Sequence, residues 1–241
     1  MREEIMKAII IKISFSEAFF KVHYTKGFRL TYPIPLPTTV AGIFGAFLGV
    51  EREKIGDLKK FLFGAKIEEY KGFINENATF RQYKSYGVEI GVATLNLINN
   101  PTYLIALAGE EAEVIKIQDK IRKSVEFLPY GGQNDFFAED WTVVGIDDVT
   151  ESDEIVNYAP QDWVDISMKS DLEVTLQILP VMHTLSDNPN FYFITRGKIR
   201  LNRKIPCTKS EKIGLYSLRS FRMEKYDGKM GQPSLQAKSS K

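Results

Sequence analysis

The stretch that says most about the fold is Thr31–Gly49, which reads TYPIPLPTTVAGIFGAFLG. Three alternate prolines forbid a helix in its first half and favour an extended segment. Thr38 or Thr39 can then cap a helix that runs to the end of the stretch. The start of such a helix offers free backbone N–H groups and threonine hydroxyls, which suit a phosphate.

Glycines recur inside this predicted helix at steps of three and four residues, at Gly42, Gly45 and Gly49. Each interior glycine costs about 0.5–1 kcal/mol relative to alanine, so we expect a packing or contact requirement. One interpretation is a smooth stripe on which another backbone approaches closely. The alternative is a helix that packs tightly on its own sheet, and the residues leave both open.

The segments on either side supply predicted strands. Met6–Phe15 carries a β-branched run that is typical of a buried central strand. After the predicted helix we expect a short helix at Asp57–Phe63, ended by Gly64, and then a strand at Ala65–Phe73. Asn75–Asn77 is a predicted turn, after which the chain continues into a hairpin.

Two hairpin strands and a second, clearer helix follow. Thr79–Leu97 predicts two strands joined through Gly87 and Gly91, and Thr102–Leu107 predicts the next strand. Apolar residues then recur at helical steps, with glutamates in the first turn and cations late. The apolar positions of this predicted helix are Val114, Ile117, Ile121, Val125 and Leu128. Trp141–Ile146 supplies a further strand.

The order is therefore β-α-β-(hairpin)-β-α-β, the ferredoxin-like arrangement shared by many RNA-recognition domains. We expect an α+β fold with a ferredoxin-like domain over residues 1–150 and a thumb hairpin at about 75–100. A β-rich C-terminal appendage is expected over 151–226, and a disordered tail over 227–241. The predicted strands of the appendage are Leu172–Val181, Phe191–Leu201 and Leu215–Phe221. Asp147–Asp165 is expected to connect the two parts.

The net charge of +1 is unevenly distributed along the chain. Glu139–Glu173 holds eleven acidic residues and one basic residue, which gives −10. The residues beyond Glu173 hold thirteen basic and four acidic residues, which gives +9. The acidic stretch is either a solvated surface or a face shaped for a basic partner.

The composition also bounds the compartment. A single cysteine, Cys207, excludes an internal disulfide and a zinc site built on several thiolates, which suits the cytoplasm. The longest apolar run, Val40–Val50, has eleven residues, whereas a spanning helix needs about 20. We therefore expect no membrane segment, and the N-terminus does not predict a secretory signal.

A second glycine motif lies in Phe127–Ala138, which reads FLPYGGQNDFFA. The adjacent Gly131 and Gly132 let backbone amides come close to a phosphodiester, and Tyr130 can stack on a base. A helix C-cap followed by a tight turn explains the same glycines without a ligand.

Two further segments combine cations with rings or apolar residues. Thr79–Tyr86 alternates rings and cations, as single-strand binders require, unless it is a surface hairpin with snorkelling side chains. Cations at Arg196, Lys198 and Arg200 alternate with apolar or small residues, so a strand there would show one cationic face. That face is either a nucleic-acid surface or an ordinary half-exposed strand.

Together, in this order and at this spacing, Thr31–Gly49 and Pro129–Ala138 resemble the CRISPR-associated family numbered five (Cas-five) of the RAMP superfamily, a subunit of type I Cascade complexes. That family carries a proline-rich stretch before a glycine-rich helix, and a Pro-x-x-Gly turn before its last ferredoxin-like strand. Gly131 stands where leucine is common, and Gln133 replaces the usual arginine. The resemblance covers about the first 150 residues.

The resemblance implies a non-catalytic subunit that binds the 5′ handle of CRISPR RNA (crRNA) and seats the large and backbone subunits of Cascade. The implied RNA contacts are Lys26, Arg29, Tyr32, Thr38, Thr39, Gly42, Arg81, Tyr83, Lys84, Tyr86, Tyr130, Gly131, Gly132, Gln133 and Asn134. Target DNA is a further partner through the complex, and no cofactor or metal is expected.

Two alternatives remain open at this point. Some members of the family cleave precursor RNA without a metal, and His23 beside Tyr24 and Lys26 is the candidate base for such cleavage. A subunit that contacts only proteins during assembly is the second alternative.

Overall fold

A computed structural model describes residues 6–22, 25, 27–165, 171–179 and 183–221. The helices are α1 (Pro37–Leu48) and α2 (Glu111–Lys123), with 3-10 helices η1 (Arg52–Lys60) and η2 (Gln161–Trp163). The strands are β1 (Met6–Phe15), β2 (Glu17–Ala18), β3 (Phe28–Arg29), β4 (Leu62–Glu69), β5 (Phe73–Lys84), β6 (Gly87–Asn99), β7 (Thr102–Glu110), β8 (Ala138–Ile155), β9 (Tyr158–Pro160), β10 (Val164–Asp165), β11 (Glu173–Ile178), β12 (Asn190–Arg196), β13 (Ile199–Thr208) and β14 (Tyr216–Ser217). The fold is therefore mixed α+β and rich in strands.

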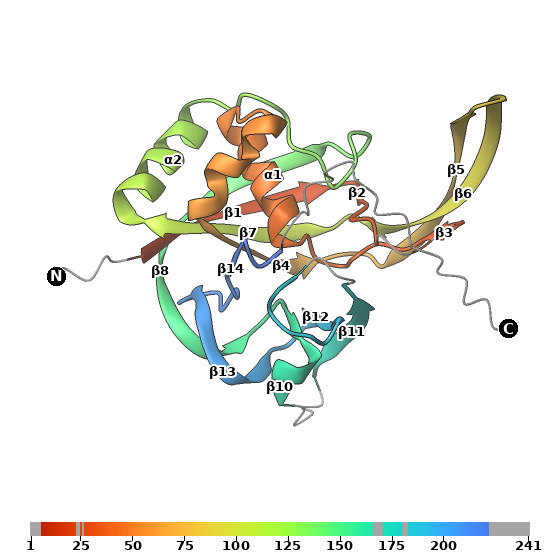
Figure 1. Cartoon of the computed structure of the whole chain (residues 1–241). Helices are drawn as coiled ribbons and strands as arrows, with labels where there is room; N and C mark the ends of the chain where they lie inside the picture. Colours follow the sequence, from red (N-terminus) through yellow and green to blue (C-terminus); the bar gives the residue numbers. More distant parts are fainter. Residues whose placement is uncertain (1–5, 23–24, 26, 166–170, 180–182, 222–241) are drawn as a thin grey trace, which may run out of the picture.

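A seven-stranded antiparallel sheet has the order β10-β13-β8-β1-β7-β4-β14, with β1, β7 and β4 in the middle of the molecule and β13 and β10 in its lower part (Figure 1). Its central strand β1 is buried on both faces from Ala8 to Ile11, because α1 and α2 cover one face and the C-terminal segments lie on the other. Ile9 and Ile11 belong to the core that includes the helices, whereas Ala8 and Ile10 pack with Ile213. This two-sided burial explains the uninterrupted β-branched run of the sequence.

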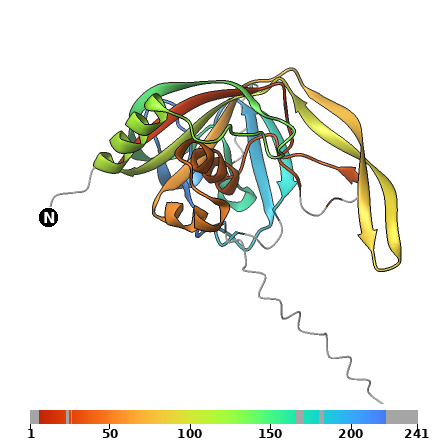
Figure 2. The ribbon, with the colours of Figure 1, turned by 90° about the horizontal axis from the view of Figure 1, so that it is seen from above.

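The hairpin β5–β6 projects from the body at the end opposite α2 (Figure 2). Its strands pair from Phe73↔Ile98 to Lys84↔Gly87, and β2 and β3 pair with β6 near its base. Phe19 packs on the base of the hairpin in a small cluster with Leu95, Leu97 and Phe136. The predicted hairpin is confirmed, and it starts and ends slightly outside the predicted strands.

The strand at Met6–Phe15 and the helix α2 are also confirmed, but α2 ends at Lys123. Val125 and Leu128 therefore lie beyond the helix to which the sequence assigned them. Both residues lie in the loop toward β8, where Val125 packs on the core and Leu128 is exposed. Their helical spacing therefore did not reflect a continued helix.

Three predictions between α1 and β6 are wrong. The predicted helix at 57–63 is a 3-10 helix that ends at Lys60, and Gly64 lies inside β4 rather than ending a helix. Glycine is required at 64 because a Cβ there would lie 2.3 Å from the Gly214 carbonyl oxygen. Residues 75–77 form no turn, because Asn75 and Asn77 accept hydrogen bonds across the hairpin from β6 side chains.

The predicted connector at 147–165 is also wrong, since β8 runs to Ile155 and β9 and β10 follow. Residue 150 lies within β8, and β13 and β14 join the same sheet as β1, so the chain does not separate there. The predicted strand at 191–201 is divided by Gly197, which has φ +87°, into β12 and β13. The expected tail at 227–241 lies outside the described residues. No described helix is both long and apolar enough to cross a membrane.

Candidate nucleic-acid interface

The two glycine motifs flank one short segment, Ala18–Phe20, although they are far apart in the sequence. The Phe19 N–H donates to the Gly131 carbonyl at 2.8 Å. On the other side, the Phe20 N–H donates to the Thr31 hydroxyl at 2.9 Å, and the Tyr32 N–H donates to the Phe20 carbonyl at 2.8 Å. The structure therefore brings the approach to α1 and the Gly-Gly bend to the same region of the molecule.

Gly131 and Gly132 serve the packing of the bend on this segment. A Cβ at Gly132, whose φ is +92°, would lie 2.1 Å from the Phe19 carbonyl oxygen. Both amides are already bonded, since the Gly131 N–H donates to the Phe136 carbonyl and the Gly132 N–H donates to the Tyr130 carbonyl. The prediction that these two amides bind a phosphodiester therefore fails, because the chain itself occupies them.

The predicted cap of α1 by Thr38 or Thr39 is wrong. Leu36 is the N-cap and makes no side-chain cap, so Thr38 and Thr39 lie inside the first turn. Within the described part of the chain, neither threonine hydroxyl has a hydrogen-bond partner. Gly42 is exposed on the next turn, and nothing lies within 4 Å of the position where its Cβ would stand. These three positions leave a small, side-chain-poor strip at the helix start.

The other two glycines of α1 do not extend this strip. A Cβ at Gly45 would lie 2.8 Å from Ile55 Cδ1, and Gly49 ends the helix with a φ of +67°. Tyr32 is not accessible either, because it is 1% exposed and stacks on Phe193 with ring centroids 5.4 Å apart. Tyr32 is a core residue, so the prediction that it binds RNA is wrong.

A cation and a ring meet on the hairpin face that bears Gly91. Arg29 reaches across β6 from β3, and its guanidinium lies 5.2 Å from the centroid of the Phe80 ring on β5. The approach is possible because the Phe80 ring lies over Gly91, where a Cβ would be 2.5 Å from it. In the described segments Arg29 has no carboxylate partner. The pair therefore places a guanidinium without a described carboxylate partner against a partly buried ring.

At the tip of the hairpin, the charge of Lys84 is compensated by a carboxylate of the same hairpin. Lys84 pairs with Glu89, and the Tyr86 hydroxyl donates to the same carboxylate at 2.9 Å. The hydrogen bond with Glu89 raises the pKa of Lys84, and the same bond lowers the pKa of Glu89. Lys84 would therefore have to leave Glu89 before it could bind a phosphate.

Arg81 and Tyr83 lie on the opposite hairpin face from Phe80. Tyr83 is 77% exposed, and Arg81 has no ion-pair partner among the described residues. Across the hairpin from them stand Val88 and Ile90, which are also exposed. Both side chains are therefore accessible, and their predicted contact with RNA stays a prediction.

The remaining predicted contacts fall in two places. Gln133 and Asn134 lie at the tip of the Gly-Gly bend, where Asn134 is exposed and the Gln133 carbonyl accepts from the Phe136 N–H. His23 and Lys26, together with Tyr24, lie outside the described residues. No group of three or more His, Cys, Asp or Glu side chains that could hold a metal occurs within the described ranges.

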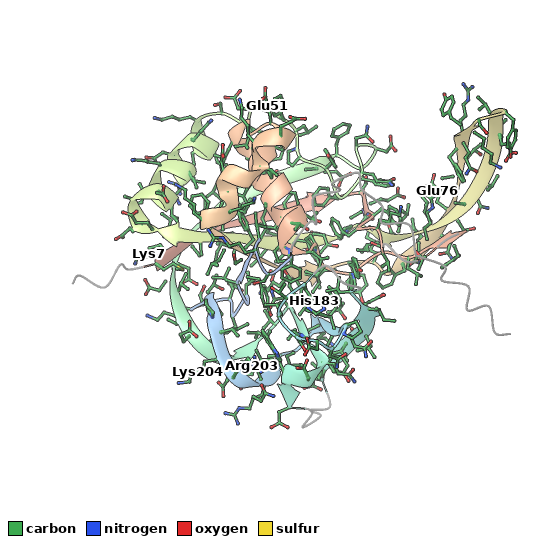
Figure 3. All side chains as sticks on the ribbon, viewed as in Figure 1. Lys7, Glu51, Glu76, His183, Arg203 and Lys204 are labelled. Carbon is green, nitrogen blue, oxygen red and sulfur yellow. The ribbon has the colours of Figure 1, made fainter. Side chains whose placement is uncertain are left out.

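The three cations singled out in the predicted strand at 191–201 are paired within the chain. Arg196 bonds Glu173 at 2.6 Å, Lys198 bonds Glu154 at 2.6 Å, and Arg200 bonds Asp153 at 3.2 Å. The basic partner of the acidic stretch is therefore, at these positions, the chain's own C-terminal part. Arg203 and Lys204 extend this region at the lower end of the molecule, away from the hairpin that bears Glu76 (Figure 3).

Sequence reasoning missed Phe19, and it included Phe80 only as one ring of Thr79–Tyr86 and not among the named contacts. Phe19 joins the bend to the hairpin base, and Phe80 carries the guanidinium of Arg29. Gly91 gave a usable signal for Phe80, because glycine inside a strand indicates close approach of another group. No pattern in the sequence distinguished Phe19 from an ordinary core residue.

No family model and no curated protein matches the chain. It is similar to a chain of a CRISPR RNA-guided surveillance complex, with 16% identity and a TM-score of 0.47 over 83% of this chain and 91% of that one. A Cas protein shows 14% identity and a TM-score of 0.40 over 80% and 95% of the two chains. A chain of a type III-B Cmr-beta complex bound to cognate target RNA and AMPPnP shows 13% identity and a TM-score of 0.38 over 81% and 86%. At these levels of likeness, we rest the functional proposal on the chain's own residues and geometry.

Proposed function

We propose that the chain is a non-catalytic RNA-binding subunit of a type I CRISPR Cascade complex, acting in the cytoplasm. It would hold the 5′ handle of crRNA and seat the large and backbone subunits, with target DNA reached through the complex. In this proposal the strands β8-β1-β7-β4 with α1 and α2 form the ferredoxin-like core, and β5–β6 is its thumb. The motifs at 31–49 and 129–138 supply the family resemblance.

The observation that carries the proposal is the Arg29–Phe80 pair on a projecting hairpin. Single-stranded RNA needs an aromatic face for a base and a cation for the adjacent phosphate. The Arg29 guanidinium lies 5.2 Å from the centroid of the Phe80 ring with no described carboxylate to neutralise it, so a base can stack on the guanidinium plane that the ring supports. Arg81 and Tyr83 offer a second cation and ring on the other face.

The helix start supplies the second contact in this proposal. Thr38, Thr39 and Gly42 form a strip with little side-chain bulk, so an RNA backbone can approach α1 closely there. Gln133 and Asn134 would add amide hydrogen bonds from the tip of the bend. Gly131 and Gly132 would act indirectly, because they fix the bend against Phe19.

The test is a titration of the purified chain with labelled CRISPR repeat RNA and with unrelated RNA of equal length. We expect preferential binding of the repeat RNA and no product bands. Phe80→Ala should weaken binding by about 1–3 kcal/mol, the usual loss for one stacked base. The matched control is Phe73→Ala on the same hairpin, whose ring packs on Tyr70.

The other outcomes separate the alternatives. Product bands abolished by His23→Ala would replace the binding role by RNA cleavage. Equal affinity for both RNAs would leave a subunit that serves assembly alone, and an unchanged affinity for the Phe80 variant would remove the hairpin from the interface.

A further inference from the structure

The segment between α2 and β8 forms a small two-stranded ribbon with one buried and one exposed face. Its inward residues are Pro129, Gly131, Phe136 and Ala138, and all four are buried. Its outward residues are Leu128, Tyr130, Phe137 and Glu139, and all four are exposed. Three of the four outward residues are therefore large and apolar, although they face away from the core.

Backbone hydrogen bonds hold the ribbon in this orientation. The Gly131 N–H donates to the Phe136 carbonyl at 2.7 Å, and the Ala138 N–H donates to the Pro129 carbonyl at 2.9 Å. The bridge between Tyr130 and Phe137 lies between these bonds, so the two residues form a non-hydrogen-bonded pair. Side chains of such pairs stand close together on one face. The two rings are thus neighbours on a fixed support.

The exposed apolar surface on this ribbon is larger than a single stray side chain. Leu128 is 45% exposed, Tyr130 45% and Phe137 48%, and the adjacent Phe127 is 56% exposed. Isolated apolar residues on a surface are ordinary, whereas a contiguous group on one rigid element marks an interaction site. Interface cores are also enriched in aromatic residues.

The charge around the ribbon decides which kind of partner it fits. No lysine or arginine occurs between Lys123 and Lys169, whereas Glu126, Asp135 and Glu139 lie within or beside the ribbon. Negative charge repels a phosphate backbone and attracts a segment that carries lysine or arginine. A base could stack on Tyr130, but its own phosphate would approach these carboxylates.

We propose that this outward face is a protein-docking surface. Its occupant is a segment of a neighbouring subunit that inserts aliphatic or aromatic side chains between Tyr130 and Phe137 and carries lysine or arginine on either side. The proposed function is needed only to assign the occupant to the Cascade complex. Tyr130 then belongs to the protein interface, while the RNA is held by the hairpin, the start of α1 and the amides of Gln133 and Asn134 at the tip of the bend.

The first test compares Tyr130→Ser/Phe137→Ser with Ile115→Ser, which removes a 42% exposed apolar residue from α2. Each tagged chain is co-expressed with repeat RNA and the other subunits of its native complex. We expect the double variant to recover at least about tenfold less of its protein partner, as loss of an aromatic anchor pair requires. Its affinity for repeat RNA as a purified chain should be unchanged, and the control should match the wild type in both assays.

Two results would overturn the proposal. One is a loss of RNA affinity with the complex intact, which would return the rings to the RNA site. The other is normal recovery of the complex together with normal RNA affinity. Recovery of the protein partner by a chain that shows no preference for repeat RNA would defeat the proposed function and leave this surface standing.

A second measurement does not depend on how the double variant folds. A photo-reactive phenylalanine derivative at position 137 replaces one exposed ring by another of similar shape, and position 115 serves as the control. In the assembled complex, irradiation should link position 137 to a protein segment that contains lysine or arginine beside apolar residues. Cross-links to RNA, or none above the level seen at position 115, would contradict the proposal.

Discussion

Replacing Arg29 and Arg81 by alanine should change the salt dependence of RNA binding by a predictable amount. Neither guanidinium has a carboxylate partner in the described residues, so each is free to neutralise one phosphate. Each such contact with single-stranded nucleic acid contributes about 0.7 to the slope of log Kobs against log salt. The double variant should therefore have a slope that is less steep by about 1.4.

This difference is large enough to measure directly. Between about 50 and about 200 mM salt, the wild-type chain should lose about sevenfold more affinity for repeat RNA than the double variant loses. Fluorescence anisotropy of a labelled repeat RNA at four or more salt concentrations gives both slopes. The same series reports whether affinity at low salt falls, as the loss of two charge contacts requires.

The control removes the same number of charges from cations that are already paired. Arg196→Ala with Lys198→Ala deletes the partners of Glu173 and Glu154. Its salt slope should equal that of the wild type. Equal slopes for the Arg29/Arg81 variant and the wild type would refute the assignment of RNA phosphates to the hairpin, and a shallower slope for the control would place the contact on β12 and β13 instead.

Three further predictions concern charge and backbone geometry. Glu89→Gln should strengthen RNA binding and steepen its salt slope by up to about 0.7, because Lys84 becomes free; weaker binding would contradict this. Gly132→Ala should destabilise the fold by about 2 kcal/mol or more in denaturant titrations, because of its positive φ and the nearby Phe19 carbonyl, whereas Gly42→Ala at an open helical site should stabilise by about 0.5–1 kcal/mol. The hydrogen bond from Lys7 lowers the pKa of Asp148 below its ordinary value of 3.8. The ionised Asp148 carboxylate therefore stabilises the fold above pH 3.8, and this stabilisation is lost as the pH falls further. The denaturation midpoints of Asp148→Asn and the wild type should therefore differ near neutral pH and converge in acid, and a constant gap would count against the ion pair.

Apolar patterns in the sequence predicted those strands and helices whose position depends on burial alone. The run Ala8–Ile11 is apolar because both faces of β1 are covered there, and α2 shows its buried stripe at Val114, Ile117 and Ile121. The order of elements along the first part of the chain followed from these signals. Their packing into one sheet with β13 and β14 did not, because pairing between distant strands leaves no mark on either strand.

The acidic stretch shows why charge misled the prediction at 147–165. Its many carboxylates resembled a polar connector, yet most of them lie on the long strand β8, with Asp162 in η2 and Asp165 in β10. Their charges are compensated by residues far away in the sequence, since Lys7 and Lys209 both bond Asp148, and Lys198 bonds Glu154. A pattern that counts only neighbours along the chain cannot show such pairing.

The sequence predicted the exposed hairpin but not the surroundings of the other candidate residues. Alternating rings and cations correctly indicated a hairpin that exposes Arg81 and Tyr83. The sequence could not show that Tyr32 is buried against Phe193, or that the amides of the Gly-Gly bend are bonded within the chain. Glycine tolerates both close packing and ligand approach, so its presence does not say which of the two occupies the space.

Zero-length photo-cross-linking tests the hairpin interface most directly. Repeat RNA that carries 4-thiouridine in its 5′ handle is irradiated with the wild-type chain, and the linked peptides are identified by mass spectrometry. We expect links at Phe80, Tyr83 or Tyr86, with none in β10 to β13. Links confined to β10 to β13, or a hairpin left unmodified while RNA is fully bound, would contradict the account.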